Sequence, residues 1–403
     1  MADVRPFSAF VPKEGMARKV ATLPYDVVNR AEAAALAEGN PVSFLRVTRS
    51  EIELPESVHP YSPEVYAKAA DNWRKIKDMA LRKMPSGFFV YSLVMDGRRQ
   101  TGIVAAASVA DYQAGIVRKH ERTRQDKEDD RTRHISTLRA QTGPVFLTYR
   151  ESAPLDSIVA ETTQEVPLFD FTAEDGIHHT GWCISASRTE DVAAAFRDIP
   201  ILYIADGHHR AASACRTETM LKEEGKPVGE ADRFLAVIFP ASQLKILAYN
   251  RIVMDLNGLD DDAFMKKLHE VCTVSETDSP VPSAPGFVHA YFQKRWLKLD
   301  FTAYSPEDVI DRLDVSLLQN NLLKPVLGID DPRTSKRIDF VGGIRGTDEL
   351  TKLVDNGAAK IAFSMYPTSL EQLMDVADEN KIMPPKSTWF EPKLRDGLFV
   401  HEI

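Results

Sequence analysis

Five consecutive residues with side chains suited to phosphate chemistry stand near the middle of the chain, at Asp206–Arg210 (Asp-Gly-His-His-Arg). The preceding run Ile199–Ala205 is apolar and β-branched, which is typical of a buried strand, and Ala211–Leu221 has the composition of a helix. The five residues are therefore predicted to lie on a strand-to-helix turn. The first N–H groups of a helix lack partners within it and carry the positive end of its dipole, so an anion binds there readily.

Each residue type of this turn suits a bound phosphate. Gly207 lets the backbone approach the anion closely. The imidazoles of His208 and His209 and the guanidinium of Arg210 offer charge-assisted hydrogen bonds. We expect these four residues to bind phosphate groups, and Asp206 and His209 to take part in catalysis. Asp206 also suits a magnesium ion, and the alternative is that it merely caps a helix whose polar side chains are solvated.

A second concentration of charge surrounds the pair His120-Glu121. The basic residues near this pair are Arg118, Lys119, Arg122, Arg124 and Lys127. A carboxylate in such surroundings stays ionised and can act as a base. The alternative is an exposed helix start whose charges pair at three- and four-residue spacing, and the spacing alone does not decide between the two.

Other polar groups are weaker candidates. The basic loop Asp331–Asp339 is interpreted as solvated surface, and the pair His178-His179 as structural in preference to a metal or active-site role. The sequence contains no GxxxxGK[ST] loop, no GxGxxG after a strand, no HExxH and no GxSxG. Any nucleotide site in this chain must therefore be of a less common kind.

Composition narrows the class of protein. The chain has 403 residues, of which 43% are hydrophobic and 27% charged, so it can form two or three folded units. Its 50 basic and 59 acidic residues give a net charge of −9, which argues against nucleic acid as the main partner. The three cysteines form no CxxC pair, and no segment has the length and apolarity of a signal peptide or a membrane span. We expect a cytoplasmic protein without a membrane partner, and a homo-oligomer stays open.

Hydrophobic periodicity predicts an α/β (α+β) protein with a mixed sheet. The pattern predicts a helix over Pro63–Met84, hairpins around Asp96-Gly97 and over Phe287–Phe301, and a helix over Asp260–Val271. Alternating helices and strands are expected again up to the end of the chain. Three regions are predicted: an N-terminal α/β region with a hairpin at 1–112, a catalytic region at 113–278 and a C-terminal α/β region at 279–403.

Seven motifs spread along the chain resemble those of the domain-of-unknown-function family 1015 of bacteria and archaea. They are Val4–Phe7, Pro24–Val28, Lys119–Thr123, Ala205–Arg210, Asp331–Arg333, Asp339–Gly343 and Pro384–Phe390. The central region is more remotely similar to the ParB/sulfiredoxin superfamily, in which a strand leads to a turn whose basic end holds nucleotide phosphates. The resemblance implies a ParB/sulfiredoxin-like central unit within a larger mixed-sheet protein.

Within that superfamily the order His-Glu, then Asp-Gly-His-His-Arg, is similar to that of free L-serine kinases. The resemblance implies that Glu121, beside His120, removes the proton of the serine hydroxyl. The two motifs are farther apart here than in the small kinases, since residues 152–199 intervene. Lys386 and Trp389, in the polar and proline-rich segment near the C-terminus, are predicted to bind the acceptor or close over it.

The leading hypothesis is a kinase that transfers a phosphoryl group between ATP or ADP and a small metabolite, with free serine as the first candidate and Mg²⁺ bridging the phosphates. Three alternatives stay open. The same site could act on phosphoserine as a phosphatase, or sense a nucleotide as a ParB-like binding protein. A metal-dependent hydrolase with His208 and His209 as ligands needs further ligands that the sequence does not identify.

Overall fold

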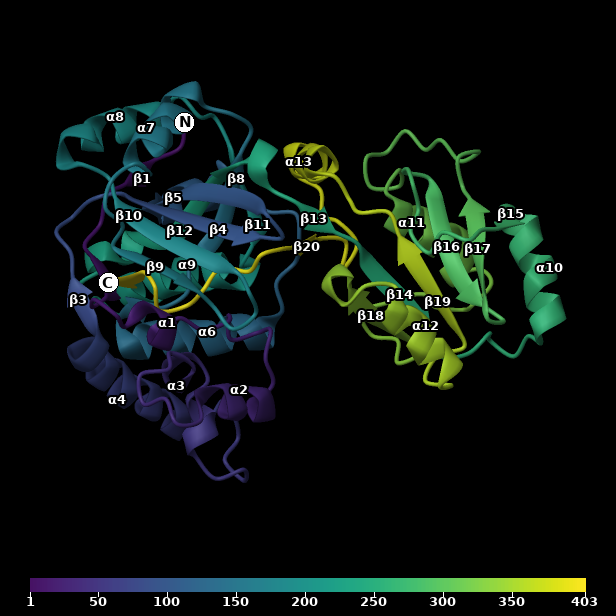
Figure 1. Cartoon of the computed structure of the whole chain (residues 1–403), viewed down its shortest axis with the longest axis horizontal. Helices are drawn as coiled ribbons and strands as arrows, with labels where there is room; N and C mark the ends of the chain where they lie inside the picture. Colours follow the sequence, from purple (N-terminus) through teal and green to yellow (C-terminus); the bar gives the residue numbers. More distant parts are fainter. The chain divides into compact units, whose positions relative to one another are not determined.

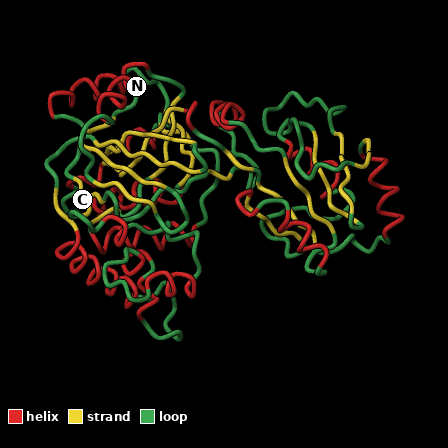
Figure 2. The backbone as a smooth tube through the Cα atoms, in the orientation of Figure 1, coloured by secondary structure: helices red, strands yellow, loops and turns green.

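The computed structural model describes residues 1–403 and separates the chain into two compact units. Unit 1 comprises Met1–Leu244 and Pro392–Ile403, and unit 2 comprises Lys245–Glu391. Both units combine helices with β-sheets, as Figure 2 shows, which confirms the predicted α/β class. The division differs from the three predicted regions, because the last strand of the chain pairs with strands of unit 1 instead of closing a C-terminal region of its own.

The largest sheet of unit 1 has nine strands in the order β6-β11-β8-β12-β5-β4-β10-β9, with β1 against β5 (Figure 1). Its strands are β1 (Val4–Arg5), β4 (Phe89–Met95), β5 (Arg98–Ser108), β6 (Val117–Arg118), β8 (Val145–Tyr149), β9 (Phe169–Thr172), β10 (His178–Cys183), β11 (Leu202–Asp206) and β12 (Arg233–Pro240). Strands β4 and β5 form the predicted hairpin, and Asp96 and Gly97 at its tip both have positive φ, of 51° and 75°.

A smaller sheet of unit 1 joins distant parts of the chain. Its order is β3-β2-β21-β7, with β2 (Ala9–Pro12), β3 (Leu81–Lys83), β7 (Ala140–Gln141) and β21 (Val400–Glu402). Strand β3 explains why the helix predicted over Pro63–Met84 ends at Ala80: Leu81–Lys83 turns to pair with β2. Tertiary pairing here overrides the helical pattern of the sequence.

Helices cover the large sheet on two sides. In Figure 1, α7 and α8 lie on one side of it, and α6 and α1–α4 on the other. The helices of unit 1 are α1 (Ala17–Val20), α2 (Arg30–Ala37), α3 (Leu45–Thr48), α4 (Pro63–Ala80), α5 (Val109–Gln113), α6 (Gln125–Leu138), α7 (Ala153–Thr162), α8 (Thr189–Arg197) and α9 (His208–Glu223). One apolar core contains Ile204 of β11, Ala211 of α9 and Phe196 of α8, so the strand and helix around the Asp206–Arg210 turn are fixed by burial.

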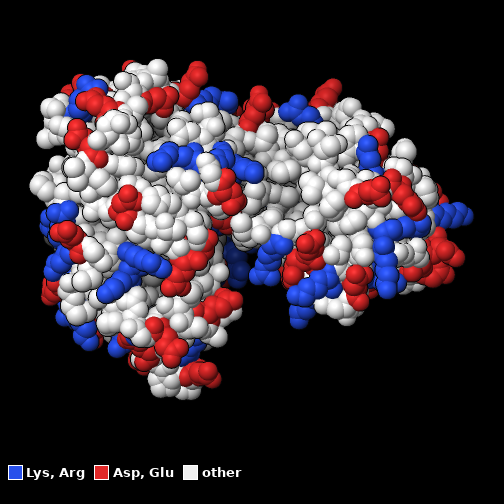
Figure 3. All heavy atoms as spheres, viewed as in Figure 1, with Lys and Arg blue, Asp and Glu red and all other residues white.

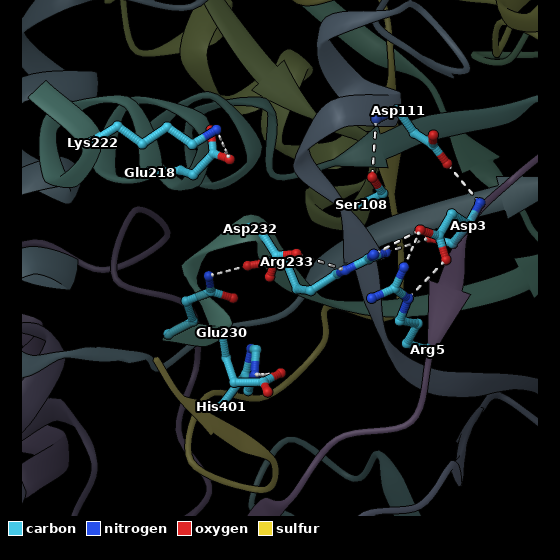
Figure 4. Close-up of polar contacts among 11 residues, drawn as sticks. Asp3, Arg5, Ser108, Asp111, Glu218, Lys222, Glu230, Asp232, Arg233 and His401 are labelled. Atoms are coloured by element: carbon cyan, nitrogen blue, oxygen red, sulfur yellow. Dashed lines mark hydrogen bonds and ion pairs between the residues drawn. The ribbon is translucent and has the colours of Figure 1, made fainter. Parts of the chain in front are cut away.

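The N-terminus of unit 1 is tied to the sheet by an ionic network (Figure 4). The carboxylate of Asp3 accepts a hydrogen bond from Arg233 at 2.6 Å and pairs with Arg5 at 3.1 Å. The backbone N–H of Asp3 donates to Asp111 at 2.6 Å, and the Ser108 hydroxyl caps α5 by accepting from the Asp111 N–H at 3.1 Å. This network joins β1, β12 and α5.

Unit 2 is built on a six-stranded antiparallel sheet in the order β15-β17-β16-β19-β14-β18. Its elements are β13 (Ile246–Leu247), β14 (Tyr249–Val253), α10 (Asp261–Val271), β15 (Thr273–Glu276), β16 (Phe287–Phe292), β17 (Arg295–Asp300), α11 (Asp314–Leu318), β18 (Ile338–Gly342), α12 (Asp348–Asp355), β19 (Ile361–Met365), α13 (Leu370–Asp378) and β20 (Trp389–Phe390). The hairpin predicted over Phe287–Phe301 is confirmed as β16 and β17.

Basic and acidic side chains are interspersed on the face drawn in Figure 3, so neither unit displays a broad patch of one sign there. None of the helices combines the length and the apolar character that crossing a membrane requires.

Candidate functional site

Two neighbouring parallel strands bring the two predicted motifs to one edge of the large sheet. Strand β6 pairs in parallel with β11, with Leu202 opposite Val117 and Tyr203 opposite Arg118. His120-Glu121 follows β6 after one residue, and the turn Asp206–Arg210 begins at the last residue of β11. Because parallel strands end at the same side of a sheet, the two motifs leave it together.

The turn itself has the geometry that its sequence predicts. Gly207 has φ 91° and is the N-cap of α9, and no side chain caps this helix. The Gly207 N–H donates to the Asp206 carboxylate at 2.9 Å. A Cβ atom at position 207 would lie 2.8–2.9 Å from the Arg210 guanidinium, so glycine is required both by the backbone and by the packing of Arg210.

The two histidines of the turn hold the segment that carries Glu121. The backbone N–H of His120 points to Nε2 of His208 at 3.5 Å, and the two rings meet edge to face with centroids 4.5 Å apart. The backbone N–H of Arg124 donates to Nε2 of His209 at 3.0 Å. Both imidazoles therefore face the segment after β6, and Glu121 lies half-buried on that segment, between the two contacts.

Burial keeps these imidazoles neutral. It lowers the pKa of His120 to about 4, and it lowers the pKa of His208 well below the ordinary value, with a further contribution from His120. Burial also lowers the pKa of His209. The expectation that the histidines add positive charge at the turn is corrected by these surroundings, because an imidazole that accepts a backbone hydrogen bond at a buried position is uncharged.

The positive charge near the turn comes from Arg210 and from Lys393, a residue near the end of the chain. Lys393 Nζ lies 3.3 Å from the Asp206 carboxylate, and Arg210 lies 3.6 Å from it. Burial would raise the pKa of Asp206, but Lys393, Arg210 and the neighbouring His208 together lower it far below its usual range. Asp206 is therefore a carboxylate held between two cations.

Behind the turn, a second layer of buried charged and aromatic side chains surrounds Arg210. A cavity of about 30 Å³, large enough for a water molecule, is lined by Tyr25, Arg131, Arg210 and Asp396 among others. The Arg131 guanidinium stacks on the Tyr25 ring at 4.1 Å. Oδ1 of Asp396 and Nε of Arg210 are buried and have no hydrogen-bond partner in the protein. Burial raises the pKa of Asp396 to about 7.

These residues of the second layer escaped the sequence-based prediction. Tyr25 belongs to the motif Pro24–Val28, which contributed to the family resemblance without being given a role. Arg131 looks like one more charge of a polar helix. Lys393 and Asp396 follow a proline-rich segment, and they reach the site only because the chain returns to unit 1 at Pro392.

The two predicted acceptor-binding residues lie in unit 2, where both contact Tyr249. The Trp389 ring meets Tyr249 edge to face at 5.0 Å, packs on Gly342, and donates its indole N–H to Glu391 at 2.9 Å. The Lys386 ammonium lies 5.4 Å from the centre of the Tyr249 ring. These contacts give both residues a packing role within unit 2, and their role toward an acceptor stays a prediction.

The pair His178-His179 lies on β10 and is structural. His179 is fully buried between the rings of Phe171 and Tyr91, and its Nδ1 is hydrogen bonded to the Tyr91 hydroxyl at 2.8 Å. The basic loop before β18 forms local pairs: Arg333 with Asp331 at 3.0 Å, and Arg337 with Asp255. Neither group points to a second site.

The surroundings of Asp206 do not form a metal site of their own. No three His, Cys, Asp or Glu side chains lie together as ligands of one metal ion. The Asp206 carboxylate is already engaged by Lys393 and Arg210. Magnesium prefers free carboxylate, phosphate and water oxygens, so its predicted contact with Asp206 has no support in this arrangement.

Comparison with known proteins gives one family match. The model of the family described as "Protein of unknown function (DUF1015)" matches residues 4–316. No curated protein matches the chain.

Three of the similar solved structures share 11–13% identity with the chain. A mutant free serine kinase in complex with AMP covers 71% of this chain and 86% of its own, at 13% identity and a TM-score of 0.36. SbnI with a C-terminal truncation from Staphylococcus aureus covers 72% and 82%, at 11% and 0.38. A conserved hypothetical protein from Pyrococcus furiosus covers 73% and 94%, at 13% and 0.35.

Proposed function

This chain belongs to the DUF1015 family of proteins of unknown function, and we propose that it is a phosphotransferase acting between a nucleotide and the hydroxyl group of a small metabolite. The observation that carries the proposal is the shared sheet edge of β6 and β11. At this edge the segment with Glu121 follows one strand, and an uncapped helix N-terminus with a nearby guanidinium follows the other.

The phosphate half of the site is the N-terminus of α9. In the proposal, the backbone N–H groups of His208 and His209 donate to phosphate oxygens, and Gly207 allows the close approach. Arg210 supplies a guanidinium beside the same turn. Only 10% of the Arg210 side chain is exposed. Phosphoryl transfer depends mainly on positioning and on neutralising the phosphate oxygens, and these groups are suited to both tasks.

The acceptor half of the site is the segment after β6. Glu121 accepts the proton of the acceptor hydroxyl while the hydroxyl oxygen forms a bond to the terminal phosphorus of the nucleotide. The bond from that phosphorus to the bridging oxygen breaks, and the nucleotide leaves with the electron pair and one phosphate fewer, as ADP from ATP or as AMP from ADP. His120, His208 and His209 act here as positioning residues, since their contacts hold the Glu121 segment against α9.

Free L-serine is the proposed acceptor, with ATP or ADP as the nucleotide partner. The support is the order of the two motifs, His120-Glu121 and then Asp206–Arg210, which is similar to that of free L-serine kinases. The transfer is reversible, so phosphoserine and ADP can also serve as substrates. Nucleotides are supplied to the assay as magnesium complexes.

The test is direct analysis of products. Purified full-length protein is incubated with ATP and serine, with ADP and phosphoserine, and with phosphoserine alone, and the products are identified by mass spectrometry. We expect phosphoserine in the first mixture, ATP in the second and nothing in the third. Release of phosphate from phosphoserine alone would favour a phosphatase. Nucleotide binding without any turnover would favour a nucleotide-sensing protein.

Two variants separate the halves of the site. Glu121→Gln should lower turnover by about 100-fold or more while nucleotide affinity changes little, because a general base contributes roughly 10²–10⁴-fold. Arg210→Met should weaken nucleotide binding. Lys222→Met is the matched control, since Lys222 lies in the last turn of the same helix and pairs with Glu218 at 2.6 Å. Wild-type turnover in Glu121→Gln would refute the role of Glu121.

A further inference from the structure

The last twelve residues of the chain return to unit 1 after unit 2 is complete. The chain leaves unit 1 after Leu244 and returns at Pro392. Its final strand β21 inserts between β2 and β7. The segment Pro392–Asp396, here called the return segment, therefore connects unit 2 to a strand held within a sheet of unit 1. It lies outside residues 4–316, which the family model matches.

Buried contacts fix the return segment in place. Nε of Arg395 donates to His179 at 3.3 Å, and its guanidinium also pairs with Asp175. The backbone of Asp396 exchanges two hydrogen bonds with Thr22, at 3.0 and 3.2 Å. Arg395 and Asp396 are 4% and 2% exposed. A segment held by a partly buried ion pair and a backbone bridge positions its side chains with little freedom.

This anchoring places two charged side chains of the return segment around the α9 turn. Lys393 reaches Asp206 at 3.3 Å, with only 14% of its side chain exposed. Asp396 lines the cavity behind Arg210, and Gly143 approaches it so closely that a Cβ atom there would overlap its carboxylate. Lys393 is thus held at the Asp206 carboxylate, and Asp396 lines the same cavity as Arg210.

The charges at the turn indicate a role for Lys393 in binding an anion. A phosphate bound at the N-terminus of α9 arrives next to the Asp206 carboxylate, which repels it. The Lys393 ammonium and the Arg210 guanidinium lie 3.3 Å and 3.6 Å from the Asp206 carboxylate and neutralise its charge. Both cations are therefore within reach of an anion bound next to Asp206, at Gly207. A lysine ammonium on a flexible stem can share its three donors between a carboxylate and a phosphate.

We infer that the return segment belongs to the functional site. Lys393 binds a phosphate group and pairs with Asp206 in the absence of ligand. Asp396 is a positioning residue for Arg210. The inference rests on the proposed function for its nucleotide substrate. The binding of a phosphate group by Lys393 can be tested separately with inorganic phosphate.

The experiment measures binding of ADP and of inorganic phosphate to full-length protein by calorimetry. Lys393→Met should weaken both by roughly 10- to 100-fold, since a hydrogen bond to a charged group contributes about 1.5–3 kcal/mol. It should also reduce the loss of affinity with added salt. Lys393→Arg should recover part of the affinity. Lys77→Met is the matched control, because Lys77 pairs with Glu402 at 2.6 Å and so also ties the C-terminus to unit 1.

A double variant keeps the test valid if Lys393→Met alone unfolds the protein. Combining it with Asp206→Asn removes both charges, so no buried carboxylate is left without its partner. The double variant should melt near the wild-type temperature and still bind ADP weakly. Equal ADP affinity in the folded double variant and in Asp206→Asn alone would overturn the inference.

The outcomes separate the inference from the proposed function. If wild-type protein binds inorganic phosphate through Lys393 but neither binds ADP nor transfers phosphate, the inference stands and the proposed function fails. If ADP binds and Lys393→Met changes nothing, the inference fails and the proposed function stands. If neither ligand binds to the wild type, both are wrong.

The positioning role of Asp396 is tested by the pH dependence of binding. The charged and titratable groups that face Asp396 or line its cavity are Arg210, Arg131, His134, Arg395, Asp26 and Tyr25. Asp396→Asn should reduce the change in ADP affinity between pH 6 and 8 to the part that comes from the titration of the ADP phosphate itself. A purely structural residue would leave the pH profile unchanged. An identical profile in wild type and variant would refute this role.

Discussion

Unit 1 contains two ionic clusters, one around Asp3 and Arg233 and one around Asp206 and Arg210. The Arg5 side chain of the first is 60% exposed, whereas the Lys393 side chain of the second is 14% exposed. In each, an aspartate lies between two cations: Arg233 and Arg5 in the first, Lys393 and Arg210 in the second. The clusters differ in the helix beside them. Ser108 caps α5 next to the first cluster (Figure 4), whereas no side chain caps α9 next to the second.

The difference between the two clusters lies in the backbone N–H groups next to each aspartate. At the first cluster the backbone N–H of Asp3 is itself bonded to Asp111, so the network joins the N-terminal strand to α5. At the second, the left-handed Gly207 is the N-cap of α9, and no side chain caps the first N–H groups of the helix. We infer that the capping of the neighbouring helix, more than the side-chain composition, separates the proposed phosphate-binding cluster from the structural one.

The largest expected effect comes from closing the open helix N-terminus. Gly207→Ala forces a side chain into a left-handed position and against the Arg210 guanidinium. Turnover should fall by about 100-fold, as expected when a binding group moves by about 1 Å, and stability by about 1–3 kcal/mol. Steady-state kinetics and urea unfolding measure the two. In the matched variant Ser108→Ala, the lost cap should cost about 1 kcal/mol and no activity.

The next effect separates stability from binding. Arg233→Met should lower the free energy of unfolding by about 1.5–3 kcal/mol, because its hydrogen bond to a carboxylate is lost, and should leave ADP affinity unchanged. Arg210→Met should lower ADP affinity by roughly 10- to 100-fold. Equal losses of affinity in the two variants would remove the distinction between the clusters.

A smaller effect is expected in the pH dependence of stability. Burial raises the pKa of Asp396 from 3.8 to about 7, so the folded state holds a proton that the unfolded chain has already released. Its contribution to stability is full below about pH 4 and is lost as the pH rises through 7. Asp396→Asn should therefore gain stability relative to wild type, on the order of 1 kcal/mol or more, between pH 5 and pH 8. Urea unfolding at both values measures it, and a constant difference would contradict the assignment.

The smallest effect is expected in unit 2. Lys386→Met removes only the contact with the Tyr249 ring, so unfolding should change by less than about 0.5 kcal/mol. ADP affinity should stay within about twofold, because Lys386 belongs to unit 2 and contacts Tyr249 there. An increase in the KM for serine at unchanged ADP affinity would instead assign Lys386 to the acceptor. Steady-state kinetics with serine as the varied substrate distinguishes the two.

The parts of this site that are local in sequence were predictable, and the parts that are distant were not. The strand, turn and helix around Gly207 follow from hydrophobic pattern and composition, as does the hairpin at Asp96-Gly97. The pairing of β6 with β11 involves only two residues of β6 and joins positions 85 apart in sequence. The hydrophobic periodicity of the sequence therefore cannot predict it. Lys393 is 187 residues from Asp206, and only the return of the chain to unit 1 brings the two together.

The same limit applies to the roles of the histidines. Residue type alone suggests that His208 and His209 bind phosphate as cations, whereas their burial and their acceptance of backbone hydrogen bonds make them neutral contacts of the Glu121 segment. The burial of these two histidines depends on the packing of α6 and of the segment after β6 against α9, which the sequence around positions 208 and 209 cannot predict.

The most direct test of the central claim is a crystal structure of the full-length protein with bound ADP. The account predicts that a phosphate group accepts hydrogen bonds from the backbone N–H groups of His208 and His209, with Arg210 and Lys393 in contact with its oxygens. A nucleotide whose phosphates lie away from the N-terminus of α9 would contradict it.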